Sequence, residues 1–179
     1  KSGDNSQYPT QSFIYTLANP VSSVMTKSRE AWGQPQTYDA ITYYDGLGRK
    51  LQTRSEGESD NWVVSDAVSF NKQKGISKTW LPYFGLTMDY GVPDANLPKV
   101  NMEYDAKGRS VRETNPEGSQ SSSVYQPLKK VEYDEEDNNS GGSHANTPHS
   151  FINDGLDRLV TVQENNAGAI YSTLYEYDG

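Results

Sequence analysis

The sequence predicts an all-β fold in which antiparallel strands pair in hairpins. A short turn motif recurs along the chain, apolar residues alternate on either side of it, and no stretch offers an uninterrupted helix of ten or more residues. The segment from residue 10 to 26 is the closest approach to a helix. Asn19-Pro20 interrupts it, and the alternation of Phe13, Tyr15 and Leu17 is typical of a strand.

The composition fits a thin sheet better than a thick globule. Leu, Ile, Val and Phe make up only 31 of 179 residues, whereas 13 Tyr and three Trp can bury large rings while keeping one polar edge wet. A net charge of -8 argues against a nucleic-acid partner, whose phosphates need a basic stripe. The absence of Cys excludes disulfides and thiolate sites, and no apolar run is long enough to cross a bilayer.

The recurring motif reads Asp, two residues, Gly or Asp, then Arg, and each copy closes with a further glycine. The copies are Tyr44-Asp45-Gly46-Leu47-Gly48-Arg49 with Gly57, Tyr104-Asp105-Ala106-Lys107-Gly108-Arg109 with Gly118, and the decayed Asn153-Asp154-Gly155-Leu156-Asp157-Arg158 with Gly168. Weaker copies start at Phe70-Asn71, with the glycine displaced to Gly75, at Tyr133-Asp134 and at Tyr177-Asp178-Gly179.

The motif is typical of a type I turn between two strands. The Asp side chain caps its own backbone, and Gly48 and Gly108 are expected to take the positive φ that follows. Asp157 is expected to preserve the turn, because Asp tolerates the left-handed region. Arg49 and Arg109 are expected to contact the Asp of their own turn and so to fix the register of the hairpin, since an exposed pair stabilises by at most about 1 kcal/mol.

These motifs resemble the YD repeats of the Rhs family, in particular the Rhs-type portion of the B component of insecticidal Tc toxins. Further segments carry the resemblance: residues 39–57, Trp62 with Val64, Leu81-Pro82-Tyr83-Phe84, and His144-Ala145-Asn146-Thr147-Pro148 before Phe151. It covers roughly residues 38–179, which we interpret as a YD-repeat sheet module containing an acidic loop at 134–148. Residues 1–37 are expected to form strands that the sequence does not place.

The resemblance implies that the strands form a curved sheet, an arc of a β-shell that encloses or scaffolds a toxin or other C-terminal cargo domain. The implied protein is large and is secreted or displayed at the cell surface, and the module is not an enzyme. We expect no catalytic residue, no cofactor and no metal, and also no autoproteolytic role, because the sequence lacks the self-cleaving segment that the family has near the end of the shell. Its partners would be neighbouring repeats of the parent chain and the cargo. The strand at about residues 169–177 is the expected open edge, through which copies could self-associate.

Three groups of residues are candidates for binding a ligand, and each also has a purely structural interpretation. Trp62, Trp80, Tyr83 and Phe84 would fill the core of a sheet, or would form a glycan-stacking platform in an adhesin-like module that binds carbohydrate or a cell surface. His144 and His149 are expected to be solvated loop residues, with metal ligation as the alternative. The acidic run from Asp134 to Asn139 is expected to be an exposed loop, because it lacks the ligand alternation and the final Glu of a calcium loop.

Overall fold

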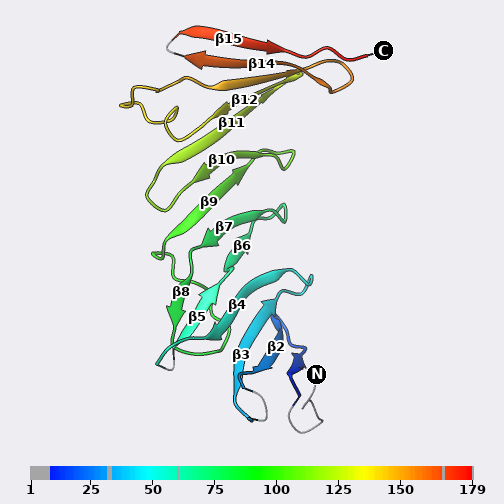
Figure 1. The fold of residues 1–179 in the computed structure, drawn as a ribbon, viewed down its shortest axis with the longest axis vertical. Helices are drawn as coiled ribbons and strands as arrows, with labels where there is room; N and C mark the ends of the chain where they lie inside the picture. Colours follow the sequence, from blue (N-terminus) through cyan, green and yellow to red (C-terminus); the bar gives the residue numbers. More distant parts are fainter. Residues whose placement is uncertain (1–8, 32–33, 60, 167, 179) are drawn as a thin grey trace. The chain divides into compact units, whose positions relative to one another are not determined.

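The computed structural model describes residues 9–31, 34–59, 61–166 and 168–178, and its strands are all antiparallel (Figure 1). The predicted all-β fold is confirmed, since these residues form strands and turns and contain no helix. Accordingly, the described segments hold no helix that could span a membrane. The chain divides into two compact units, one made of Lys1–Asn71 and Lys78–Lys99 and the other of Lys72–Ser77 and Val100–Gly179.

The first unit contains a six-stranded antiparallel sheet in the order β1-β2-β3-β4-β5-β8. Its strands are β1 (Gln11–Thr16), β2 (Ser22–Arg29), β3 (Thr37–Tyr44), β4 (Lys50–Glu56), β5 (Trp62–Ser65) and β8 (Tyr83–Gly85). The strands that the sequence could not place are β1 and β2, and β2 pairs with β3 from Ser22 to Arg29. Between β5 and β8, β6 (Val68–Phe70) pairs with β7 (Ile76–Trp80), and the boundary between the two units passes through this hairpin.

The core of the first unit follows from the alternation of its strands. On β3 the side chains of Asp39, Ile41 and Tyr43 are buried while their neighbours are more exposed. A small apolar cluster forms around Val64, Ala67 and Trp80, with Tyr83 and Leu97 packed against it. This cluster is too small to be the only support of the unit, which also buries polar groups such as Gln52 and Arg54.

The second unit is a meander in which each strand pairs with the next along the chain (Figure 1). Its strands are β9 (Lys99–Tyr104), β10 (Ser110–Thr114), β11 (Gln120–Gln126), β12 (Lys129–Tyr133), β13 (His149–Asn153), β14 (Leu159–Asn166) and β15 (Ala169–Leu174). The last strand, β15, has all its residues exposed and no described neighbour on its outer side, at the position expected for an open edge.

The segment between β12 and β13, residues 134–148, is the long loop that its composition predicts. It is folded on itself: Asp137 Oδ1 accepts the Thr147 N–H at 2.7 Å, and Asn138 Nδ2 donates to the carbonyl of Asp134 at 2.8 Å. Asn138 also donates to the carbonyl of Gln120 at 3.0 Å, which ties the loop to β11. The acidic side chains of this loop are therefore used in part as caps of its own backbone.

The repeat that starts at Phe70 differs from the prediction. Lys74, with φ 69°, takes the left-handed position of the turn, and Gly75 does not. Asn71 therefore aligns with Asp105, Lys74 with Gly108, and Gly75 with Arg109. The glycine of this copy is therefore not displaced. Lys74 replaces the glycine of the motif, and Gly75 replaces the arginine.

Candidate functional site: the repeated turns

The aspartates of the three motif copies hold their turns in the same way. The Oδ1 atom of Asp45 accepts the backbone N–H groups of Leu47 and Arg49, both at 2.9 Å. Asp105 accepts those of Lys107 at 2.8 Å and Arg109 at 3.0 Å. Asp154 repeats the arrangement with the N–H groups of Leu156 and Arg158. One carboxylate oxygen in each copy is therefore committed to its own backbone.

The second carboxylate oxygen receives the arginine four residues later. Nε of Arg49 donates to Oδ2 of Asp45 at 2.8 Å, and Nε of Arg109 donates to Oδ2 of Asp105 at 2.7 Å. Arg158 makes the same bond to Asp154 at 2.8 Å. In each hairpin the strand register shifts by a bulge beside the turn, which brings the arginine over its aspartate.

The backbone at the fourth motif position is left-handed in every copy. Gly48 has φ 76° and Gly108 has φ 80°, and Asp157 adopts φ 62° where the glycine is missing. Tyr44 and Tyr104 are the last residues of the strands that enter these turns. Of the closing glycines, Gly118 (φ 93°) and Gly168 (φ 92°) also have positive φ. Gly57 does not, and a Cβ there would lie 3.0 Å from the carbonyl oxygen of Asn61.

Replacing Gly108 by Val is expected to lower the free energy of unfolding by more than about 1 kcal/mol. No atom lies within 4 Å of a Cβ built at this position, so the loss comes from the positive φ of a β-branched residue and not from a clash. Ser110→Ala, two residues later on β10, is the matched control and should change little. Equal urea midpoints for the two variants would contradict this account of the turn.

The bonding of these turns lowers the pKa of all three aspartates. For Asp105 and Asp154 the largest cause is the backbone N–H of Arg109 or Arg158, and the arginine side chain adds to it. For Asp45 the largest single effect is partial desolvation, which raises the pKa, but the hydrogen bonds from Arg49 and Leu47 together outweigh it. The carboxylates are therefore held in the charged form.

These pKa shifts predict that stability falls on acidification. A group whose pKa is lower in the folded state stabilises the fold above its unfolded value, about 3.9 for Asp, and loses that contribution as the pH falls through the folded value. We therefore expect the melting temperature to decrease below about pH 4. Asp105→Asn should flatten this part of the profile, whereas Glu103→Gln on the preceding strand should leave it unchanged. Parallel profiles for wild type and Asp105→Asn would count against the linkage.

A second polar cluster, in the first unit, was not predicted from the sequence. Arg54 is only 6% exposed, and its guanidinium donates from Nη1 to the carbonyl of Thr87 at 2.7 Å and from Nε to Gln52 Oε1 at 2.9 Å. Gln52 donates to the carbonyl of Gly91 at 2.8 Å, and the Tyr43 hydroxyl donates to that of Met88 at 2.6 Å. Together these side chains fasten the segment after β8 to the sheet.

Three tyrosines and two glycines complete this cluster. Burial raises the pKa of Tyr43, Tyr83 and Tyr90, and the charge of Arg54 partly offsets the rise. A Cβ at Gly85 or Gly91 would lie 3.1 or 3.2 Å from the guanidinium nitrogens, so a side chain at either position would require the guanidinium to shift by a few tenths of an ångström. The only hint in the sequence is that Gln52 and Arg54 share the buried face of a strand by their spacing of two.

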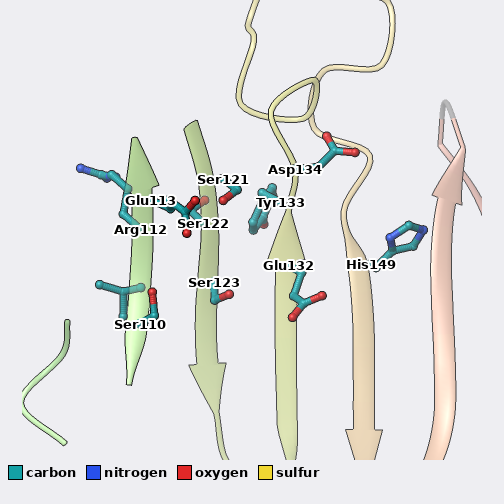
Figure 2. A pocket seen from close by; sticks show the side chains of 11 residues that line it. Ser110, Arg112, Glu113, Ser121, Ser122, Ser123, Glu132, Tyr133, Asp134 and His149 are labelled. Atoms are coloured by element: carbon teal, nitrogen blue, oxygen red, sulfur yellow. The ribbon is translucent and has the colours of Figure 1, made fainter. Parts of the chain in front are cut away.

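A shallow groove of about 290 Å³ crosses β10 to β13 in the second unit (Figure 2). Six of the side chains that line the groove have no polar partner among the described residues: Ser110, Glu113, Ser121, Ser123, Tyr133 and His149. The other charged groups are engaged, Arg112 with Glu103 and Glu132 with Lys130. The groove therefore offers hydroxyls, the carboxylate of Glu113 and an imidazole to a polar ligand.

The remaining candidates divide between the core and the surface. Trp80 is buried in the cluster with Val64 and Ala67, and Phe84 is 74% exposed, so the four aromatic residues do not share one platform. His144 and His149 are both exposed, but only His144 lies in the loop as expected, since the pairing with β12 makes His149 the first residue of β13. Across the described residues, no group of three or more His, Cys, Asp or Glu is arranged to hold a metal ion.

Comparison with known proteins places the chain in a family. A family model described as a domain of unknown function (DUF6443) matches residues 16–162, which is most of the chain. The chain belongs to the DUF6443 family. No curated protein matches this DUF6443 chain.

The DUF6443 chain is also similar to solved Tc toxin structures. It matches a crystal structure of TcdB2-TccC3 with a TM-score of 0.80 and 18% identity, over 94% of this chain and 10% of that one. The form of TcdB2-TccC3 without its hypervariable C-terminal region gives a TM-score of 0.78, 16% identity, and 88% and 9% of the two chains. The Photorhabdus luminescens Tc holotoxin pore gives 0.78, 17%, 88% and 9%.

At this level of identity the similarity establishes the fold. The resemblance to the Rhs-type portion of Tc toxins that the YD motifs predict is confirmed in that respect. The DUF6443 chain spans about a tenth of the length of the Tc toxin chains that it matches.

Proposed function

We propose that this chain is a non-catalytic structural module of a large secreted YD-repeat protein, where it forms part of a β-shell that encloses or scaffolds a toxin or other C-terminal cargo. The observation that carries the proposal is the similarity of 94% of the chain to a tenth of a TcdB2-TccC3 chain. The resemblance of the YD motifs to the Rhs family implies a shell around a cargo, so a wall segment is the role that we assign to this fold.

The chemistry of the repeated turns supports a structural role. In each copy both oxygens of the aspartate accept hydrogen bonds from the same turn, and the arginine is held by that carboxylate. Most of the hydrogen-bonding capacity of these carboxylates is used in fixing the turn, because a carboxylate has about four acceptor sites and each of these aspartates accepts at least three hydrogen bonds. The partners of this module are then the neighbouring repeats, which would pair with its edge strands, and the cargo that they surround.

The test is made on the complete protein that contains this segment. A wall role predicts that its C-terminal domain resists added protease and that electron microscopy shows a hollow particle. Deletion of residues 38–179 should open the particle and expose that domain to cleavage, whereas Phe84→Ala in the same segment should leave it protected. A C-terminal domain that is equally accessible in the wild type and in the deletion would reject the proposal.

The groove in Figure 2 favours carbohydrate binding as a second candidate function. Its hydroxyls and the Glu113 carboxylate, which have no polar partner among the described residues, are suited to sugar hydroxyl groups, and Tyr133 adds an aromatic ring at its centre. A glycan array with the chain itself provides the test. Binding that is lost in Ser123→Val and Glu113→Gln, and retained in Ser110→Ala at the rim, would favour a binding module. If no glycan on the array binds, the carbohydrate-binding function is rejected and the wall role is the one candidate that stands.

A further inference from the structure

The arginine of each motif copy also contacts an aromatic ring outside its own hairpin. The Cζ atom of Arg49 lies 3.8 Å from the ring centroid of Phe70, and that of Arg109 lies 4.0 Å from the ring of Tyr125. Arg158 stands over Tyr177 at 5.0 Å. All three distances are within the range of a cation–π contact.

The three rings occupy equivalent places in the chain. Phe70 directly precedes the turn at Asn71, Tyr125 is the penultimate residue of β11 before the connection at residues 127–128, and Tyr177 precedes Asp178 after β15. In the second unit the turn at Asp105 and the connection at residues 127–128 lie on the same side of the meander, because every second connection of a meander returns to the same side (Figure 1). Arg49 and Arg109 therefore bridge their own turns to an aromatic residue that precedes a later turn, and Arg158 reaches the aromatic residue at the corresponding place after β15.

The turn that lacks an arginine shows what replaces the bridge. Gly75 stands at the arginine position after Asn71, and no guanidinium is available for Tyr104, the aromatic residue before the next turn. There the Tyr104 hydroxyl donates to the carbonyl of Ile76 at 2.8 Å, and Gln73 Nε2 donates to the carbonyl of Asp105 at 3.3 Å. Tyr177 makes the corresponding bond, from its hydroxyl to the carbonyl of Leu159 at 2.7 Å, in addition to its contact with Arg158.

We infer that the motif arginine is the positioning residue that couples one repeat to the next, and that the aromatic residue before the following turn is its receptor. The coupling pairs are Arg49 with Phe70, Arg109 with Tyr125, and Arg158 with Tyr177. The aspartate orients the guanidinium through its edge, which leaves the planar face free to receive the ring. This inference goes beyond the proposed wall role, since it holds for any assembly of these hairpins.

The coupling has a structural purpose in a sheet of this kind. A strand pair is joined to the next by backbone hydrogen bonds, which allow a shift of register unless side chains oppose it. When the aspartate holds the edge of the guanidinium and the aromatic ring contacts its face, only one spacing between successive turns is possible. Strand register is then passed along the sheet from turn to turn, without a thick apolar core.

The test is a double-mutant cycle followed by native-state hydrogen exchange. Arg109→Lys keeps the positive charge but removes the planar face, and Tyr125→Leu removes the ring. Each should reduce the protection of the β11 and β12 amides, and the double variant should be about two- to fivefold less impaired than the product of the single effects. Arg112→Lys combined with Tyr125→Leu is the matched control, because Arg112 pairs with Glu103 and has no contact with the ring.

Two outcomes would overturn the inference. One is a multiplicative effect of the Arg109 and Tyr125 substitutions, equal to that of the control pair. The other is a loss of protection confined to residues 105–109, which would show that the arginine serves its own turn alone. If the Arg109 variants do not fold, the same cycle on Arg158→Lys and Tyr177→Leu gives the decision, since that pair is more exposed and joins the last hairpin to the segment after β15.

Discussion

Trp80→Ala is expected to destabilise the first unit by about 3–5 kcal/mol, the usual cost of removing a buried Trp side chain. Trp80 is only 6% exposed, it packs with Val64 and Ala67, and its Nε1 donates to the carbonyl of Asp94 at 3.2 Å. The substitution therefore leaves a cavity and removes one of the two hydrogen bonds that the Asp94 carbonyl accepts, the other coming from the Leu97 N–H. Because small domains are marginally stable, this loss is a large share of what holds the unit together.

Urea unfolding measures this loss, with hydrogen exchange to assign it to the first unit. Phe84→Ala is the matched control, because Phe84 follows closely on the chain and is 74% exposed. We expect the control to change the free energy of unfolding by less than about 0.5 kcal/mol. Comparable losses in the two variants would mean that these aromatic residues form a surface and not a core, in favour of the glycan platform.

Arg54→Met is expected to cost about 2–4 kcal/mol, although the side chain keeps much of its apolar length. The substitution leaves the buried side-chain oxygen of Gln52 without its donor from Arg54, and it also removes the part-buried hydrogen bond to the carbonyl of Thr87. The segment at residues 86–91 should then detach from the sheet before the strands separate. Its cleavage by a protease of broad specificity should become faster by at least tenfold.

Arg112→Met provides the comparison for Arg54. The guanidinium of Arg112 is half exposed and lies 3.7 Å from Glu103, so an ordinary surface pair is lost, worth at most about 1 kcal/mol. If Arg54→Met is no more sensitive to protease at residues 86–91 than Arg112→Met, the buried cluster is not what fastens this segment.

Local chemistry made the turns predictable. The interactions that define them run between residues two and four apart, as from Asp105 to Lys107 and Arg109, so a six-residue motif contains all the participants. Asp157 in the left-handed position shows the same principle, because the tolerance of Asp for that region is a property of the residue itself. Lys74 was missed because its own side chain gives no such signal, and the neighbouring Gly75 gives a misleading one.

The sequence by itself determined the fold class, the positions of the turns and the ion pair within each of them, since all of these depend on residues that are neighbours in the chain. Only the tertiary structure decided that Trp80 is buried while Phe84 is exposed. It also decided that Arg54 contacts a segment more than 30 residues away and that the guanidinium of Arg109 packs on the ring of Tyr125. The physical reason is that a pattern of period two shows which residues share a face of a strand. What covers that face depends on strands brought together by folding.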